Sequence, residues 1–381
     1  MIRVVVLIGT RPEAIKMAPI IRELRSDPEI FHCCVVSSGQ HREMVQQALK
    51  PFQIRVDVQC DAMSAAKSLG SLTARLFEDL DQVYESEQPD WVLVQGDTNT
   101  AMAGALCAFY RRIKVGHVEA GLRTFDRFSP FPEEVNRSII GQVADLHFAP
   151  TQKSVANLHN AGMNNDAIVV TGNTVVDALL WIKTLLPEDA PEQLSEILDN
   201  RLQEQRLILV TAHRRESFGD GLVRICDSLV KLVDAFPDCI IVFPVHLNPN
   251  VQKVVLTRLS GHPRIVLTNP LEYLSLLWLM RRASVILTDS GGIQEEAPSF
   301  HKPIVILRET TERPEVVDAG FGRLVGTDAD AIFETASAAL VDRQWHSEID
   351  LKESPFGDGR ASQRIARTLS RQSKRPIGTQ Q

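Results

Sequence analysis

The chain lacks the cysteine spacing of a disulfide scaffold or of a zinc site. Its six cysteines form no CxxC pair, and two of them, Cys33 and Cys34, are adjacent, which makes a mutual disulfide geometrically awkward. The HExxH arrangement of zinc ligands is also missing. We therefore expect reduced thiols in the core and no metal ion.

Long apolar runs and an excess of positive charge are missing too. No segment reaches the ~18 uninterrupted apolar residues of a membrane-spanning helix, and the opening run MIRVVVLIGT is too short for the core of a signal peptide. With 41 Lys and Arg against 48 Asp and Glu, the formal net charge is -7, so no cationic field attracts nucleic acid or an anionic membrane. We expect a cytoplasmic protein whose partner is a small molecule, with no nucleic acid and no membrane.

Two common nucleotide-binding motifs are absent as well. The sequence contains neither the GxxxxGK[ST] of a Walker loop nor the GxGxxG of a dinucleotide-binding turn. A phosphate site in this chain must therefore have another design.

The chain does contain a regular alternation of short apolar runs with longer stretches of helical period. The runs of the first half, rich in Val and Ile, are VVVLIG, CCVVSSG, WVLVQGD, KVGHVEAG, LHFAPT and IVVTGN. After the acidic segment LLPEDAPEQLSEILDN, a second series follows: LILVTAHR, CIIVFPVH, RIVLTN, VILTDSGG, KPIVILRE and RLVG. This alternation predicts parallel sheets with crossover helices, which is an α/β fold.

The length of 381 residues suits two hydrophobic cores. We predict two Rossmann-like, doubly wound domains, at residues 1–172 and 173–358. Open parallel sheets bind ligands at the carboxyl ends of their strands, so we expect the two domains to face a central cleft surrounded by the polar motifs.

ILTDSGGIQEEAP predicts a phosphate site, with an apolar strand, a turn at Ser290, Gly291 and Gly292, and then a helix start. Free amide groups at a helix start bind anions, and glycines allow close approach to the backbone. An ordinary strand-to-helix turn explains the same residues. Glu296, one helical turn further on, is placed to accept hydrogen bonds from ribose hydroxyls or to be a solvated helix charge.

GTRPEAIK repeats this arrangement at the first strand, with Arg11 and Lys16 near a helix start. Cations there oppose the helix dipole, so their presence indicates an anion between them. TAHRRES offers His213 and Arg214 at the first strand end of the second domain, and TTERPE adds Arg313. Arginine suits bidentate contact with phosphate, whereas a lone histidine is more often structural than catalytic.

Three acids follow strands of the first domain: Asp97 in QGDT, Glu119 in HVEAG and Glu133 in PFPEE. Grouping carboxylates in one cleft is costly, so the group indicates acid/base chemistry with separated pKa values. The alternative is that each acid caps a helix or pairs with a nearby arginine.

Taken together, several segments resemble the non-hydrolysing UDP-N-acetylglucosamine 2-epimerases of bacteria: GTRPEAIKMAP, GQHREM, VQGDT, VEAGLRT, SPFPEEVNR, TGNTVVDAL, TAHRRESFG, PVHLNPNV, TDSGGIQEEAP and TTERPE. The resemblance runs from residue 1 to about residue 370. It implies the glycosyltransferase B architecture, in which a C-terminal helix, here 359–375, rejoins the first domain.

The resemblance also implies reversible C2 epimerisation of UDP-N-acetylglucosamine to UDP-N-acetylmannosamine without a cofactor. No carbonyl lies beside C2 to delocalise a carbanion, so the anomeric C–O bond must break first or nearly first. Elimination then gives UDP and 2-acetamidoglucal, and re-addition with a proton on the opposite face inverts C2.

By resemblance, the residues around UDP are Arg11, Lys16, His213, Ser290, Gly291, Gly292, Glu296 and Arg313. The catalytic residues implied are Asp97, Glu119, Glu133 and His213. Many members bind a second UDP-N-acetylglucosamine as an allosteric activator, and Gln40, Arg214 and His246 match that site, although an arginine that some relatives carry near Ala66 is missing. The family also implies a homodimer and a role in cell-surface polysaccharide biosynthesis.

Two departures from the family pattern lie near the predicted uracil position, where Leu271 and Leu276 stand in place of a glutamine and a phenylalanine. Three alternatives stay open. The first is a glycosyltransferase or hydrolysing epimerase with the same fold, and the second is a nucleotide-sugar sensor without catalysis. The third is an epimerase of a modified sugar, although such relatives read GARPQ where this chain reads GTRPE.

Overall fold

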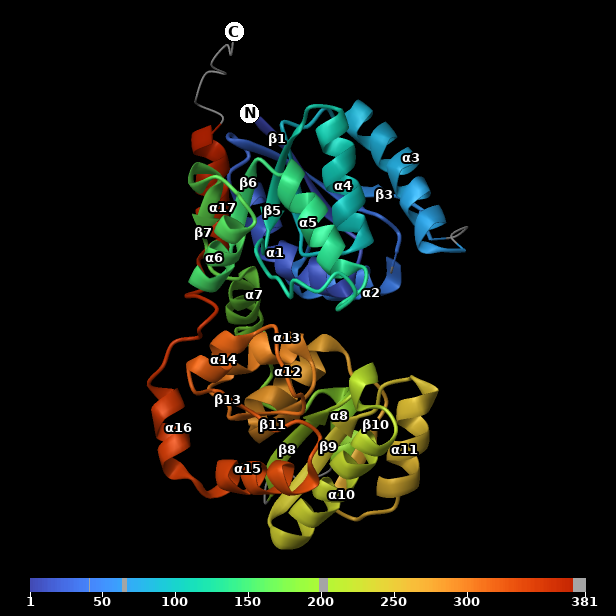
Figure 1. Ribbon diagram of the computed structural model, residues 1–381, viewed down its shortest axis with the longest axis vertical. Coiled ribbons are helices and arrows are strands. Elements are labelled where there is room, and N and C mark those ends of the chain that lie inside the picture. The colour runs from blue at the N-terminus through green and yellow to red at the C-terminus, as the bar shows by residue number, and fades with distance from the viewer. Residues whose placement is uncertain (41, 64–66, 199–204, 373–381) are drawn as a thin grey trace. The chain divides into compact units, whose positions relative to one another are not determined.

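The computed structural model describes residues 1–40, 42–63, 67–198 and 205–372. The chain divides into two compact units (Figure 1). One unit contains Met1–Trp181 and the segment from Phe356 onward, and the other contains Ile182–Pro355.

The first unit is built on a seven-stranded sheet in the order β3-β2-β1-β4-β5-β6-β7. All neighbouring strands run parallel. The strands are β1 (Ile2–Ile8), β2 (Phe31–Ser37), β3 (Val58–Gln59), β4 (Trp91–Gln95), β5 (Lys114–Val118), β6 (Leu146–Ala149) and β7 (Ile168–Val170).

Helices cover both faces of this sheet, so its central strands are buried on both sides and read as near-continuous apolar runs. Helices α3, α4 and α5 pack side by side, and α1 packs against α2 and α17 (Figure 1). The helices of the unit are α1 (Arg11–Ser26), α2 (Arg42–Leu49), α3 (Leu69–Glu87), α4 (Asn99–Tyr110), α5 (Glu133–Val143), α6 (Gln152–Asn160), α7 (Thr174–Lys183) and α17 (Ala361–Gln372).

The second unit has a six-stranded sheet in the order β10-β9-β8-β11-β12-β13, again all parallel. Its strands are β8 (Arg206–Thr211), β9 (Cys239–Pro244), β10 (Ile265–Thr268), β11 (Ala283–Thr288), β12 (Ile304–Ile306) and β13 (Gly322–Leu324). Its helices include α8 (Glu192–Leu198), α10 (Asp220–Ala235), α11 (Pro249–Leu259), α12 (Tyr273–Arg282), α13 (Gly291–Glu296), α14 (Pro314–Asp318), α15 (Ala329–Val341) and α16 (Arg343–Asp350). The prediction of two doubly wound α/β domains is confirmed.

The C-terminal helix α17 is fastened to the first unit by an acid of α7. Both oxygens of Asp177 accept hydrogen bonds from the start of α17: the amides of Ala361 at 3.2 Å and Ser362 at 2.8 Å, and the Ser362 hydroxyl at 2.6 Å. These contacts place most of α7 in the first unit, beyond the boundary predicted at residue 172. Residues 373–375 of the predicted helix lie outside the described residues.

No helix of the described chain is long and apolar enough to cross a bilayer. All six cysteines have unpaired thiols, and burial raises the pKa of Cys34 and Cys226 to about 12. Such thiols are poor nucleophiles, in keeping with the predicted place of the cysteines in the core.

Candidate active site

Three neighbouring strands of the first sheet end at predicted site residues. Strand β1 is followed by Arg11, β4 by Asp97 and β5 by Glu119. Because these strands are adjacent and parallel, their carboxyl ends meet at one edge of the sheet, which is where open α/β sheets bind ligands.

Glu119 is the most enclosed of the three predicted acids, with only 7% of the residue exposed. Its backbone is left-handed at φ 61°, which is uncommon for a residue with a side chain. Lys16 Nζ lies 2.5 Å from its Oε1, and Asn173 Nδ2 donates to the same oxygen at 2.9 Å. Gln95 Nε2 donates to Oε2. Both carboxylate oxygens are therefore oriented by donors, and Lys16, which the sequence assigned to an anion near the helix start, pairs with Glu119.

The sequence alone did not single out Glu13, which organises the turn before α1. Its Oε2 accepts hydrogen bonds from the amides of Gly9 at 3.1 Å and Thr10 at 2.6 Å, and Thr98 Oγ1 donates to Oε1 at 2.7 Å. Burial raises the pKa of this carboxyl, although the hydrogen bonds act in the opposite direction. The spacing T-x-x-E of a capping box is the signal that points to this residue.

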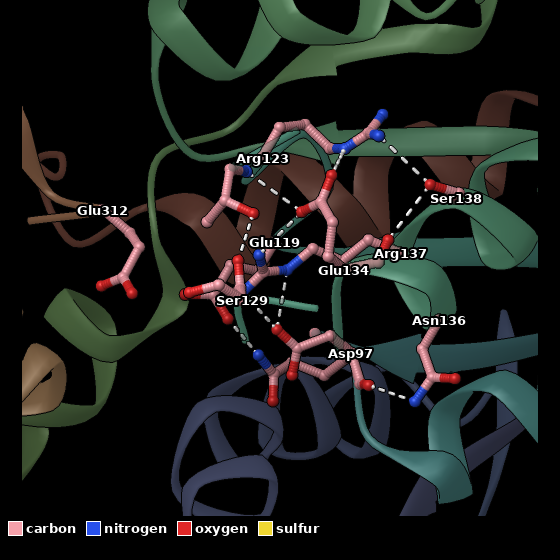
Figure 2. Close-up of polar contacts among 12 residues, drawn as sticks. Asp97, Glu119, Arg123, Ser129, Glu134, Asn136, Arg137, Ser138 and Glu312 are labelled. Carbon is pink, nitrogen blue, oxygen red and sulfur yellow. Dashed lines mark hydrogen bonds and ion pairs between the residues drawn. The ribbon is translucent and has the colours of Figure 1, made fainter. Parts of the chain in front are cut away.

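An arginine of α5 holds Asp97. Arg137 Nε and Nη2 lie 2.8 and 2.6 Å from Asp97 Oδ2, and Nη1 lies 3.2 Å from Glu134 (Figure 2). Asn136 also donates to the backbone carbonyl of Asp97 at 2.9 Å. Helix α5 thus fixes both the side chain and the backbone of this acid.

The adjacent acids Glu133 and Glu134 have different surroundings. Glu134 accepts hydrogen bonds from Arg123 Nε at 2.6 Å and from the amides of Thr124 and Phe125 at 3.0 and 3.2 Å. Burial alone would raise the pKa of Glu134, but these donors outweigh it and hold the pKa below its usual range. Glu133 is half-buried, and its buried Oε2 accepts no hydrogen bond from any described residue. Donors of the first unit thus occupy the Glu134 carboxylate but leave this oxygen of Glu133 without a hydrogen bond from any described residue.

His117, beside Glu119 in the sequence, is a neutral structural histidine. Its Nε2 lies 2.8 Å from the Gly96 carbonyl, which can only accept, so the proton sits on Nε2. Burial lowers the pKa of His117 to about 4. With Arg123 and Arg137 it lines a cavity of about 250 Å³.

In the second unit, the predicted phosphate turn follows β11. Ser290 is the N-cap of α13, and Gly291 is its first residue. A side chain at Gly291 would lie 3.3 Å from the Arg313 guanidinium, so the missing side chain lets Arg313 cover the turn. Glu295 Oε1 accepts from Arg313 Nε at 2.7 Å and holds it there. Backbone amides and a guanidinium suit an anion.

Glu296, at the end of α13, is 8% exposed and accepts a hydrogen bond from Tyr273 Oη at 2.8 Å. It is therefore not the solvated helix charge considered as the alternative. Of the two departures from the family pattern, Leu271 is buried and Leu276, in α12, is half-buried.

Asp289, fully buried beneath the turn, positions the segment after β8. Its Oδ2 accepts hydrogen bonds from the amides of His213 and Arg214, both at 2.7 Å, and its Oδ1 lies 3.3 Å from His213 Nδ1. Burial lowers the pKa of His213, and the Asp289 carboxylate partly offsets that effect. The sequence alone assigned no role to Asp289, because nothing local distinguishes it from a turn residue.

The residues matched to a second nucleotide-sugar site are divided between the units. His246 stacks on His213 with ring centroids 5.2 Å apart, and Arg214 follows directly. Gln40 belongs to the first unit, where its Oε1 accepts from Thr100 Oγ1 at 3.0 Å. Ala66 lies outside the described residues.

Comparison of the sequence with known proteins shows which family the chain resembles. A sequence model of the family described as UDP-N-acetylglucosamine 2-epimerase matches residues 22–370. The UDP-N-acetylglucosamine 2-epimerase of Escherichia coli K12 is 47% identical over 371 residues, which cover 96% of this chain and 98% of that protein. The enzyme of the same name from Yersinia pestis is 46% identical over 369 residues, covering 96% and 98%.

Solved structures of enzymes from the same family have a similar fold. The UDP-GlcNAc 2-epimerase of Neisseria meningitidis, bound to UDP-GlcNAc, superposes with a TM-score of 0.90 at 42% identity and covers 97% of this chain and 100% of its own. The enzyme of Methanocaldococcus jannaschii, in complex with UDP-GlcNAc and UDP, gives a TM-score of 0.81 at 31% identity, with the same coverage.

Two Rossmann-like domains with acids at the strand ends of one and an anion-type turn in the other define an enzyme of the glycosyltransferase B fold. The chain belongs to the UDP-N-acetylglucosamine 2-epimerase family. The predictions of this family and of an isomerase are thereby confirmed.

Proposed function

We propose that this chain interconverts UDP-N-acetylglucosamine and UDP-N-acetylmannosamine by eliminating UDP and adding it back. The names of its relatives and the ligands in the structures from Neisseria meningitidis and Methanocaldococcus jannaschii support this substrate. The observation that carries the proposal is the enclosed carboxylate of Glu119, held by Lys16, Gln95 and Asn173 at the strand ends of the first sheet.

The leaving diphosphate needs charge stabilisation as the anomeric C–O bond breaks. We assign this task to the turn at Ser290, Gly291 and Gly292 with Arg313 and His213, and to Arg11 and Lys16 in the first unit. Glu296 is assigned to the ribose hydroxyls. The buried Asp289 contributes by orienting the His213 ring and the two amides beside it.

The sugar needs groups that stabilise positive charge near C1 and move the proton at C2. We assign Asp97, Glu119 and Glu133 to these tasks. Glu119 and Asp97 are oriented by cations, Lys16 and Arg137 respectively, whereas one oxygen of Glu133 accepts from no described residue. This difference favours Glu133 as the group that exchanges a proton with C2 and the other two as fixed charges.

The proposal extends to a homodimer, to allosteric activation by a second UDP-N-acetylglucosamine at Gln40, Arg214 and His246, and to a role in supplying cell-surface polysaccharide synthesis. Sedimentation velocity tests the dimer. Single-turnover kinetics in the reverse direction, with and without trace UDP-N-acetylglucosamine, test the second site, and identical progress curves would count against it.

The decisive experiment is proton NMR of the protein with UDP-N-acetylglucosamine in heavy water, without added metal or NAD. We expect the anomeric signal of UDP-N-acetylmannosamine to grow while deuterium replaces the C2 hydrogen. Release of UDP in step with free or transferred sugar would instead indicate a hydrolase or glycosyltransferase. Binding without either change would indicate a sensor or a modified substrate.

Variants of the acids sharpen this test. Asp97→Asn, Glu119→Gln and Glu133→Gln each keep the side-chain shape, and each should lower kcat by ~10²-fold or more, with little change in UDP affinity. Glu85→Gln, an exposed position on α3, is the matched control and should keep the wild-type rate. Wild-type turnover in all three acid variants would contradict the assignment of these acids to the chemistry at C1 and C2.

A further inference from the structure

Asn173 lies where the two segments that join the units meet the first unit. It directly precedes α7, the helix in which the first unit gives way to the second after Trp181. Its backbone amide donates to the carbonyl of Phe356 at 2.7 Å, and Phe356 is where the chain re-enters the first unit. One residue thus contacts both joining segments.

The backbone around this position is closely packed. A side chain at Gly357 would lie 3.1 Å from the Cα of Gly172, which is closer than ordinary van der Waals contact. Arg364 Nη1, from α17, donates to the carbonyl of Thr171 at 2.9 Å. The segment before Asn173 therefore has little freedom to move independently of residues 356–364.

The side chain of Asn173 makes two different hydrogen bonds. Its Oδ1 accepts from the amide of Val175 at 3.0 Å and so caps the first turn of α7. Its Nδ2 donates to Oε1 of Glu119 at 2.9 Å, the oxygen that also meets Lys16. The residue is 3% exposed, so water does not replace either bond.

Resting on the proposed epimerase function, we propose that Asn173 is a positioning residue that orients the Glu119 carboxylate and links that orientation to the two joining segments. An amide that served only as an N-cap would need its oxygen alone, and a serine or an aspartate supplies that oxygen equally well. Here the nitrogen is used as well, across a buried contact to a residue 54 positions away in the sequence. A shift of the first turn of α7 moves this donor with it.

Two substitutions separate the positioning role from the capping role. Asn173→Asp keeps the cap but turns an oxygen towards Glu119, so the two carboxylates repel when both are ionised. We expect kcat at about pH 8 to fall by ~10²-fold and to recover as the pH falls, because a protonated aspartyl group donates to Glu119 as the amide does. Asn173→Ser keeps the cap but is too short to reach Glu119, and its lower kcat should not recover at low pH.

Both Asn173 variants should lower kcat while leaving the binding of UDP and of UDP-N-acetylglucosamine nearly unchanged. The affinity for UDP and the KM for UDP-N-acetylglucosamine should change by less than about 3-fold, because the amide contacts an acid assigned to chemistry and not to binding. Asn164→Asp is the matched control, because Asn164 caps a short helix at the amide of Asp166, 3.1 Å away, in an exposed position of the same unit. It should keep the wild-type rate and pH profile. Circular dichroism melting checks that every variant is folded.

Each outcome decides the matter. A folded Asn173→Ser with wild-type kcat overturns the inference, as does a lower kcat in Asn173→Asp that is the same at every pH. If the wild-type protein itself shows no C2 exchange in heavy water, the proposed function fails and the inference falls with it. That result is distinct from an active wild type whose Asn173 variants keep the wild-type kcat, which overturns the inference alone.

Discussion

His147, in strand β6, gives the first unit a measurable sensitivity to acid. The residue is 2% exposed, and burial lowers its pKa from 6.5 to about 4. Because the folded state binds this proton less readily than the unfolded state, the stability it supports is complete above pH 6.5 and is lost as the pH falls towards 4.

The magnitude follows from the two pKa values. At about pH 5 the linkage relation gives a loss of ~2 kcal/mol in the free energy of unfolding relative to neutral pH. His147→Leu removes the titrating group and should reduce the pH-dependent loss by that amount, whatever the substitution does to stability at neutral pH. Comparing the two pH-dependent losses cancels the titrating groups that do not interact with His147, whereas the pKa of His117, which His147 also lowers, changes with the substitution.

Urea unfolding at about pH 7 and about pH 5, followed by tryptophan fluorescence, measures this quantity. Trp91 reports on the same sheet, since it lies in β4. His159→Leu, on the exposed side of α6, is the matched control and should keep the wild-type pH dependence. An equal loss of stability in the wild type and in His147→Leu would refute the reasoning.

Three further predictions concern packing and buried charge. Asp177→Ala removes the acceptor for three donors at the start of α17 and should lower the unfolding free energy by ~2 kcal/mol, measured by urea unfolding; an unchanged midpoint would contradict it. Gly104→Ala puts a methyl group against Leu7 in a buried part of α4, so thermal melting should show a loss of ~1–3 kcal/mol despite the better helix propensity of alanine, and a gain would mean that Leu7 moves aside. Glu134→Gln removes the carboxylate that pairs with Arg123 and with Arg137, although Arg137 keeps its contact with Asp97, and should cost ~3 kcal/mol; the unfolding free energy would be unchanged if neither pair mattered.

The sequence predicted the elements better than the contacts between them. Parallel strands that are covered on both faces appear in the sequence as apolar runs such as VVVLI, each followed by polar residues. Arg11, Asp97 and Glu119 follow such runs, so the sequence alone assigned them to the edge of the sheet where the strands end. The boundary at residue 172 differs from the division after Trp181, because α7 is held in the first unit by contacts of Asp177 with residues nearly two hundred positions away.

The supporting residues of the site could not be predicted in this way. Gln95, at the end of β4, and Asn173, before α7, touch Glu119 only through the tertiary fold, and no local spacing in the sequence records these contacts. Asp289 reads as an ordinary turn residue until the fold brings His213 to it. Glu13 was the exception with a local signal, since a capping box is visible in the sequence.

Because α17 packs on α1, the first unit is interrupted by the second in the order of translation. A ribosome must synthesise all of residues 182–355 before the last helix of the first unit can dock. Until then, the part of α1 that packs on α17 has no cover from that helix, and such surfaces on incomplete chains are where aggregation and chaperone binding begin. A nonsense mutation near the end of the gene would therefore damage the domain encoded at its beginning.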